Sequence, residues 1–110
     1  MKKILISGIK DGSFYTDVLE KEGHIVTKVI MTQVRPLLLK YQPDLIILGT
    51  CVSSDNGVDI IKEVREYNQE INIIMIGQSD ALKRELLNEG ANDFLVKPVT
   101  SEQLLASVNK

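Results

Sequence analysis

Hydrophobic residues in this chain form short continuous runs that alternate with segments in which they recur every three or four positions. The runs are rich in Ile, Val and Leu, and this pattern predicts strands buried on both faces. Five strands are predicted, at Lys3–Ser7, Ile25–Ile30, Asp44–Leu48, Ile71–Ile76 and Asp93–Val96. Three apolar runs end in glycine, at Gly8, Gly49 and Gly77. Parallel sheets carry their sites beyond the carboxyl ends of the strands, so these glycines lie where chemistry is usually found.

The segments between the predicted strands have helical spacing. Apolar residues share one helical face in three of them: Val34, Leu37, Leu38 and Tyr41; Ile60, Ile61, Val64 and Tyr67; and Leu82, Leu86 and Leu87. Asp80 is expected to cap the fourth helix and Gly90 to end it in a left-handed turn. Thr100 with Gln103 predicts a capping box for a last helix over Ser101–Asn109. The alternation predicts a three-layer, doubly wound α/β fold with a parallel sheet.

Composition narrows the class further. The 110 residues are enough for a single domain over residues 1–110, with 44% hydrophobic and 25% charged residues. The net charge of -2 gives no reason to expect nucleic acid. No apolar run has the length of a membrane span, and the run that ends at Ser7 is too short for a signal peptide. A single cysteine, Cys51, forms no internal disulfide and fits a reducing cytoplasm, where we expect the protein.

The stretch from Gly90 to Pro98, GANDFLVKP, resembles the signature around the last strand of response-regulator receiver domains. Its most specific element is the Lys97-Pro98 step, which is commonly a cis peptide in that family. The segments Leu19–His24 and Gln42–Leu48 also resemble receiver segments at the right distances. The resemblance covers nearly the whole chain. It implies a CheY-like, flavodoxin-like (βα)5 fold with strand order 2-1-3-4-5.

The same resemblance implies which residues stand at the family's phosphorylation site. The acidic pair that holds Mg²⁺ falls on Gly8 and Ile9, and the phosphoacceptor aspartate falls on Gly49. The hydroxyl residue that follows the phosphoryl group falls on Gly77, whereas the active-site lysine is kept as Lys97. Glycine supplies no carboxylate nucleophile, and Gly8 with Ile9 offers Mg²⁺ only backbone carbonyls. We therefore expect a pseudo-receiver with no catalytic residue, no metal and no cofactor.

Phe94 falls on the family's aromatic switch position. The resemblance places it on the face of the fourth helix, last strand and last helix, which commonly binds partners or dimerises. A phenylalanine has no hydroxyl that favours exposure, so burial is expected and a core-filling role is the alternative. The leading hypothesis is a phosphorylation-independent signalling domain that binds a protein partner on this face. A homodimer that forms through the same face is the other possibility.

A second hypothesis is a sensor that binds an anion or small metabolite in a glycine-lined hollow beside Lys97. Two simpler explanations oppose this hypothesis. Lys97 can be solvated or hydrogen-bonded locally, and the neighbouring loops can collapse into the hollow. The loop from Ser7 to Ser13 could cradle a phosphate with backbone N–H groups, but a plain strand-to-helix connection is favoured. An enzyme, such as a flavodoxin-like reductase or a hydrolase, is least supported. No nucleophile and base pair stands out, and aromatic residues make up only 5% of the chain.

The remaining polar residues have ordinary explanations. Four aspartates could replace lost metal ligands, namely Asp11, Asp55, Asp59 and Asp80. Asp55 is better explained as turn and cap chemistry, so a rebuilt metal site is not expected. His24 is expected at the entry of the second strand, with no partner for a metal site or a triad. Cys51 has no basic neighbour that would lower its pKa, so no redox role is expected.

Overall fold

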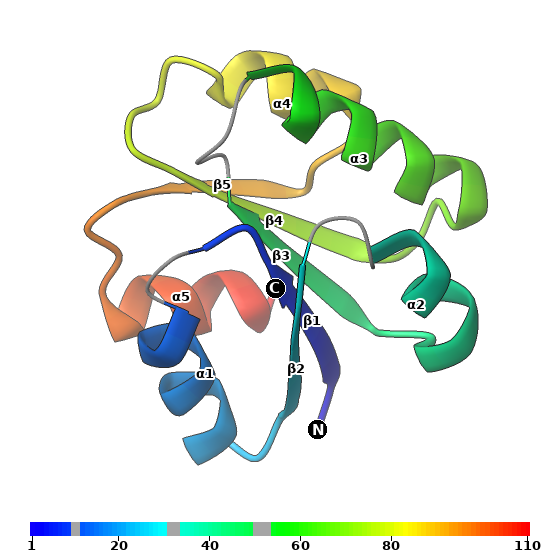
Figure 1. Ribbon diagram of the computed structural model, residues 1–110. Helices are drawn as coiled ribbons and strands as arrows, with labels where there is room; N and C mark the ends of the chain where they lie inside the picture. Colours follow the sequence, from blue (N-terminus) through cyan, green and yellow to red (C-terminus); the bar gives the residue numbers. More distant parts are fainter. Residues whose placement is uncertain (10–11, 31–33, 50–53) are drawn as a thin grey trace.

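The computed structural model describes residues 1–9, 12–30, 34–49 and 54–110. Five parallel strands form one sheet in the order β2-β1-β3-β4-β5, which confirms the predicted topology (Figure 1). The strands are β1 (Lys3–Ser7), β2 (Ile25–Val29), β3 (Leu45–Gly49), β4 (Asn72–Gly77) and β5 (Asp93–Val96). The helices are α1 (Gly12–Lys21), α2 (Val34–Tyr41), α3 (Ser54–Tyr67), α4 (Lys83–Glu89) and α5 (Ser101–Val108).

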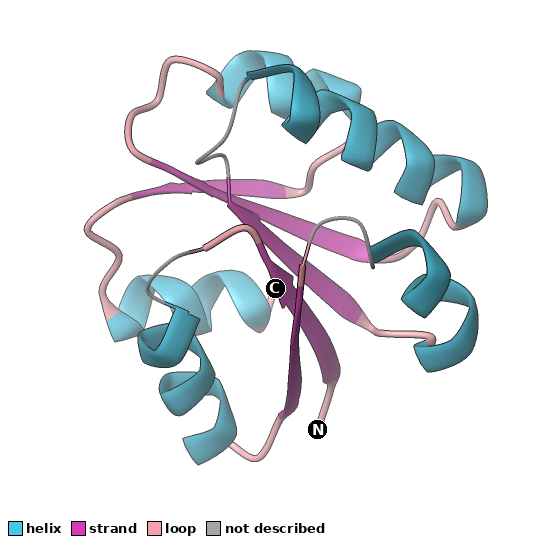
Figure 2. Cartoon of the chain, viewed as in Figure 1, coloured by secondary structure: helices cyan, strands magenta, loops and turns pink. Residues whose placement is uncertain are grey.

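The sheet lies between two helical layers (Figure 2). Side chains alternate along β3, so that Ile46 and Leu48 join the core beneath α2, α3 and α4. Leu45 and Ile47 join the second core, which α1 and α5 cover with residues such as Tyr15, Leu19, Leu104 and Val108. Every residue of β3 is buried. This explains why the strand is continuously apolar instead of alternating.

Strands β3 and β4 begin one residue later than predicted. The residue before each strand makes a polar contact outside the regular hydrogen-bond pattern of the sheet. Asp44 precedes β3, where its Oδ2 accepts the Lys3 N–H at 2.8 Å. Its own N–H donates to the Lys3 carbonyl at 2.8 Å. Ile71 precedes β4, and its carbonyl accepts a hydrogen bond from Arg65 Nη1 at 2.7 Å. Both strands then continue into the glycine that was predicted to come after them, Gly49 and Gly77.

The helix ends test the predicted caps one by one. The prediction for Asp80 is wrong, because α4 begins at Lys83 with Leu82 as its N-cap and no side-chain cap. The carbonyl of Asp80 instead accepts the Lys83 N–H at 3.1 Å in a turn that delays the helix. Gly90 ends α4 at φ +127°, as predicted. The capping box of Thr100 and Gln103 is also confirmed.

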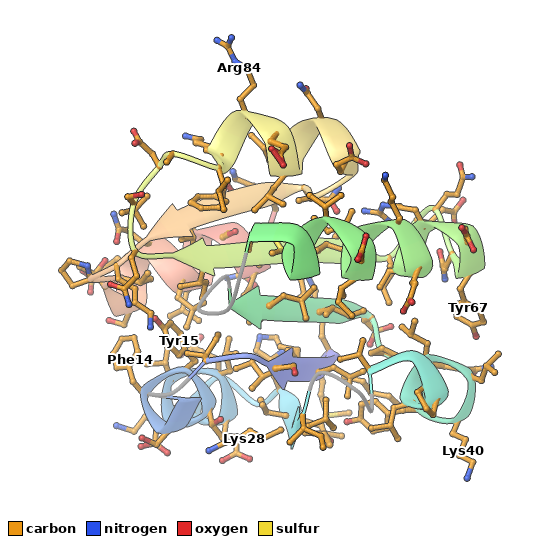
Figure 3. The ribbon with its side chains drawn as sticks, turned by 45° about the horizontal axis from the view of Figure 1, so that its top comes forward. Phe14, Tyr15, Lys28, Lys40, Tyr67 and Arg84 are labelled. Atoms are coloured by element: carbon orange, nitrogen blue, oxygen red, sulfur yellow. The ribbon has the colours of Figure 1, made fainter. Side chains whose placement is uncertain are left out.

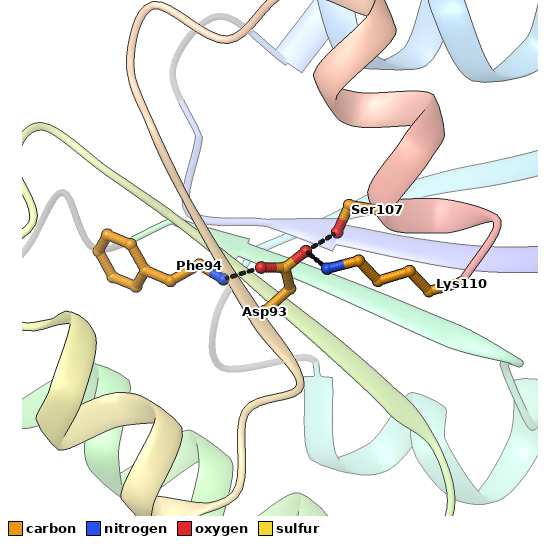
Figure 4. Close-up of polar contacts among 4 residues, drawn as sticks. All are labelled: Asp93, Phe94, Ser107 and Lys110. Carbon is orange, nitrogen blue, oxygen red and sulfur yellow. Dashed lines mark hydrogen bonds and ion pairs between the residues drawn. The ribbon is translucent and has the colours of Figure 1, made fainter.

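Asp93 joins β5 to the end of α5 (Figure 4). Its Oδ2 accepts hydrogen bonds from Ser107 Oγ at 2.6 Å and from Lys110 Nζ at 3.0 Å. Its Oδ1 accepts the N–H of Phe94 at 2.9 Å. Burial raises the pKa of Asp93, but these three hydrogen bonds and the charge of Lys110 outweigh burial, so the pKa lies below its ordinary value of 3.8.

Arg65 holds the connection from α4 to β5 against the end of α3. Its Nε and Nη2 donate to the Gly90 carbonyl at 3.0 and 2.8 Å. Nη2 also donates at 2.8 Å to Asn92 Oδ1, which in turn accepts the N–H of Ile73. The planar guanidinium thus bonds several fixed acceptors at once, as a lysine could not.

Candidate functional site

Four residues of the predicted site lie at the carboxyl edge of the sheet. Gly8 follows β1, Gly49 ends β3, Gly77 ends β4 and Lys97 follows β5. The strands are parallel neighbours, and their register pairs Ser7 with Leu48 and brings Gly49 opposite Ile76. The topology therefore gathers the predicted positions at one edge.

The space beside Gly49 is occupied by the backbone of Gly8. A Cβ built on Gly49 would overlap the Gly8 carbonyl group, with the carbonyl carbon at 2.7 Å and Ile9 Cγ1 at 3.0 Å. Gly8 has φ +75°, a conformation that glycine adopts without steric cost. Glycine at both positions thus permits a close approach of two backbone segments. The predicted hollow is filled at Gly49, as expected for collapse of the neighbouring segment.

Lys97 lies in a cleft on the α1 and α5 side of this edge. Its N–H donates to the Gly77 carbonyl at 2.9 Å, and its peptide bond to Pro98 is cis, as the resemblance implied. The cleft has a volume of about 380 Å³ and is lined by Phe14, Tyr15, Lys97, Pro98 and Val99. Lys97 is half-buried. This hydrogen bond fixes the backbone of Lys97 at the edge and leaves the role of its ammonium group a prediction.

The aromatic wall of this cleft was missed at the level of sequence. Phe14 and Tyr15 have ring centroids 5.1 Å apart in an edge-to-face arrangement, and both lie near the start of α1 (Figure 3). Tyr15 is 4% exposed, whereas Phe14 is 39% exposed. An adjacent aromatic pair directly after a strand-to-helix loop was the available signal. Only the fold shows that β5 ends beside it.

Phe94 lies on the opposite face of the sheet from this cleft. It is 4% exposed and belongs to the core beneath α2, α3 and α4, with Leu86 and Ala91. It pairs in register with Met75 of β4. The expected burial is confirmed. A central sheet separates Phe94 from the cleft beside Lys97.

One buried hydroxyl near the edge was also missed. Ser7 is 2% exposed, and its Oγ has no hydrogen-bond partner among the described residues. It follows Ile6 of the α1 and α5 core, so alternation turns it toward α2, α3 and α4. An unpaired buried hydroxyl costs roughly 1–3 kcal/mol. A serine at the end of an apolar strand was the signal for this position.

The described residues at this edge do not fit a magnesium ion. No group of three or more His, Cys, Asp or Glu side chains in the described ranges is placed to hold a metal. Asp59 and Asp80 are exposed. Asp11 and Cys51 lie outside the described residues, as does the side chain of Asp55. Gly8 and Ile9 bring backbone carbonyls, and Mg²⁺ in proteins is usually bound through one or two carboxylates.

His24 lies at the amino edge, before β2, as predicted. Its Nδ1 accepts the N–H of Lys2 at 3.1 Å. Burial, the charge of the N-terminus and the charge of Lys2 lower its pKa below the ordinary value of 6.5, and Glu22 opposes them. The hydrogen bond requires the lone pair of Nδ1, so it requires neutral imidazole.

The sheet order and the two helical layers define a doubly wound, flavodoxin-like α/β protein. Residues 13–109 match the family model of the response regulator receiver domain. The chain therefore belongs to the response regulator receiver family.

Relatives of this chain include short and long regulators. The chain is 30% identical over 119 residues to chemotaxis protein CheY of Thermotoga maritima, covering 99% of this chain and 96% of CheY. It is 37% identical over 71 residues to the probable C4-dicarboxylate response regulator DctR of Halalkalibacterium halodurans, covering 63% of this chain. That match spans only 31% of DctR.

Solved structures agree on the fold. A putative response regulator from Chloroflexus aurantiacus superposes with a TM-score of 0.88 at 25% identity, covering 98% of this chain and 94% of that chain. A response regulator receiver domain protein from Clostridium thermocellum superposes with a TM-score of 0.86 at 23% identity, covering 99% and 92%. No helix among the described residues is long and apolar enough to cross a membrane.

Proposed function

We propose that residues 1–110 form one receiver-like domain that signals through protein contacts without being phosphorylated. The observation that carries the proposal is the contact between Gly8 and Gly49. Gly49 supplies no carboxylate, and the Gly8 carbonyl occupies the space that a side chain there would need. The loss of the nucleophile and the closure of its space are separate obstacles to aspartyl phosphate formation. In this proposal the domain catalyses no reaction, needs no cofactor and works in the cytoplasm.

The test is amide NMR with Mg²⁺ and beryllofluoride, a mimic of a phosphoryl group. We expect no saturable shifts at Gly8, Gly49 or Gly77. A receiver with aspartate at the end of its third strand serves as the positive control under the same conditions. Saturable shifts clustered at these three glycines would contradict the proposal.

The partner surface in this proposal is formed by α4, β5 and α5. Phe94 is buried beneath it, which supports a ring held inward and contacts made by outward-facing residues. Arg84 projects from α4, and Val96 of β5 is 38% exposed (Figure 3). A hollow of about 410 Å³ along α4 is lined by Asp80, Lys83, Arg84, Leu87 and Asn88. We propose a protein partner here, and neither nucleic acid nor a membrane.

The alternative occupant of this surface is a second copy of the chain. Sedimentation equilibrium up to about 1 mM protein tests it, because that range covers even weak dimers. A dimer that Arg84→Glu dissociates would assign the surface to self-association. A monomer throughout the range favours a different protein.

A second candidate function is an anion sensor in the cleft beside Lys97. The supporting observation is the 380 Å³ cleft, in which Lys97 is the charged residue among the described lining and Phe14 and Tyr15 form an aromatic wall. Thermal unfolding with inorganic phosphate or succinate up to about 10 mM tests it, since a bound ligand raises the melting temperature. A rise that is lost in Lys97→Ala supports the sensor. No rise, or a rise that persists in Lys97→Ala, contradicts it.

A further inference from the structure

A groove runs between α2 and α3, away from both the carboxyl edge and the surface of α4. Its volume is about 270 Å³, and it is lined by Leu38, Leu39, Glu63, Glu66 and Tyr67. Small-molecule pockets in proteins usually have volumes of about 300–1,000 Å³ and enclose their ligand. The groove lies just below this range and can take side chains that project from another polypeptide.

The groove exposes apolar surface that the fold does not use. Leu38 is 1% exposed and forms its floor, whereas Leu39 is 64% exposed and Tyr67 is 41% exposed. Leu39 and Tyr67 come from different helices, yet both line the same groove. Two large apolar groups exposed beside a buried floor form the kind of surface that a partner helix covers.

The charge beside the apolar strip of Leu39 and Tyr67 is negative and unpaired among the described residues. Glu63 and Glu66 have no ion-pair or hydrogen-bond partner among the described residues. The two cations of the same stretch of α3 are engaged on the side of α4 and β5. Lys62 pairs with Glu89 at 3.9 Å, and Arg65 bonds Gly90 and Asn92. Figure 3 shows Lys40 projecting from α2 away from Tyr67.

The charges of Glu63 and Glu66 favour a basic partner over a second copy of the chain as the occupant of the groove. A second copy that docked by the same groove would place four carboxylates, Glu63 and Glu66 of each copy, in one interface, since a two-fold interface uses the same surface on both copies. Like charges brought together across an interface are costly. A segment with apolar side chains one helical turn apart and flanked by Lys or Arg would fill the strip and pair both carboxylates.

We propose that the groove between α2 and α3 binds a basic amphipathic helix of a protein partner. Leu39 and Tyr67 contact its apolar face, and Glu63 and Glu66 contact its lysines or arginines. This surface is separate from that of α4, β5 and α5, and the inference does not depend on whether the domain is phosphorylated.

The test uses a synthetic 14-residue helical peptide of leucine and lysine, with leucines on one face, titrated into the full chain. We expect NMR shifts confined to α2 and α3. The double variant Glu63→Lys with Glu66→Lys should weaken binding by about tenfold or more, the effect of about 1.4 kcal/mol. The matched control is Asp17→Lys with Glu20→Lys, which has the same spacing on exposed positions of α1. It should leave the affinity within about twofold.

A second pair of variants tests the apolar contact. Leu39→Ser should weaken binding several-fold, while Ile30→Ser, at a site 68% exposed and outside the groove, should not. The proposal is overturned if no binding is seen at millimolar peptide, or if the NMR shifts extend over helices other than α2 and α3. It is also overturned if both double variants lose the same peptide affinity. Shifts in α2 and α3 that depend on protein concentration without peptide would assign the groove to self-association and also overturn it.

Discussion

The carbonyl group of Gly8 fills the space in which a side chain at Gly49 would lie. Two backbone segments therefore meet at the carboxyl end of β3, the position that we propose has lost a phosphoacceptor. The contact depends on glycine at Gly49, where a Cβ would overlap the carbonyl group, and Gly8 itself adopts φ +75°, a conformation that favours glycine. A single added carbon at Gly49 should thus be enough to disturb it.

Gly49→Ala should lower the free energy of unfolding by roughly 2–3 kcal/mol, because the clash is with backbone that has little freedom to move. Gly23→Ala is the control, since φ is +89° there but nothing lies within 4 Å of the added Cβ. It should cost about 1–2 kcal/mol, from its left-handed conformation alone. Urea denaturation measures both. Equal costs would mean that Gly8 moves aside easily and that the site is not closed.

Ser107→Ala should lower the free energy of unfolding by about 1–2 kcal/mol, because it removes the 2.6 Å hydrogen bond from the buried Ser107 hydroxyl to Asp93 Oδ2. In a double-mutant cycle with Asp93→Asn, the two changes should couple by about 1 kcal/mol. Asp17→Asn, at an exposed site on α1, is the control and should change stability by less than about 0.5 kcal/mol. Additive effects of Ser107 and Asp93 would show that the contact does not contribute.

The pKa of Asp93 also predicts an acid dependence. The native pKa lies below the ordinary value of 3.8, so the folded state binds the proton less readily than the unfolded chain. The contribution of Asp93 to stability is thus complete above 3.8 and is lost as the pH falls through the native pKa. Asp93→Asn should flatten the stability profile in this acid range, as measured by urea denaturation at several pH values. An unchanged profile would contradict the assignment.

Arg65→Lys should lower the free energy of unfolding by roughly 2–3 kcal/mol, because lysine cannot bond Gly90, Ile71 and Asn92 together. Arg84→Lys, on the exposed side of α4, should change it by less than about 0.5 kcal/mol. Hydrogen exchange should show faster opening around Gly90 in the Arg65 variant alone. Similar losses of stability in both variants would mean that replacing any arginine by lysine has this effect, and that the hydrogen bonds of Arg65 are not responsible.

His24 predicts a loss of stability at mildly acidic pH. Its native pKa is lowered, so the unfolded chain binds the proton more readily between the native pKa and 6.5. Stability should be constant above this window and fall as the pH drops below 6.5. His24→Asn keeps an acceptor for the Lys2 N–H without titrating there. Melting temperatures from pH 8 to 5 should show a shallower slope for this variant, and identical slopes would contradict the prediction.

Much of the fold was predictable because its signals are local. Continuous apolar runs marked every strand to within about one residue, and Thr100 with Gln103 marked the start of α5. The prediction that Asp80 caps α4 was wrong for a physical reason as well. The Asp80 carbonyl closes a turn with Lys83, so the helix begins three residues after the position that the sequence marked.

The candidate site was predictable only in part. The glycines at the strand ends follow from the sequence, because their positions at the edge depend only on strand direction. The cleft of Phe14, Tyr15 and Lys97 does not, since it joins residues from opposite ends of the chain. The groove of Leu39 and Tyr67 likewise required the spacing of α2 and α3.

By itself the sequence determined the order of elements, the absence of a side chain at Gly8, Gly49 and Gly77, and the presence of Lys97 after the last strand. These are properties of single positions and of local periodicity. Only the tertiary structure decided that the Gly8 carbonyl closes the space at Gly49, that Phe94 and Lys97 lie on opposite faces, and which apolar residues stay exposed. Such relationships depend on packing between distant segments, because close-packed interiors respond to shifts smaller than one side chain.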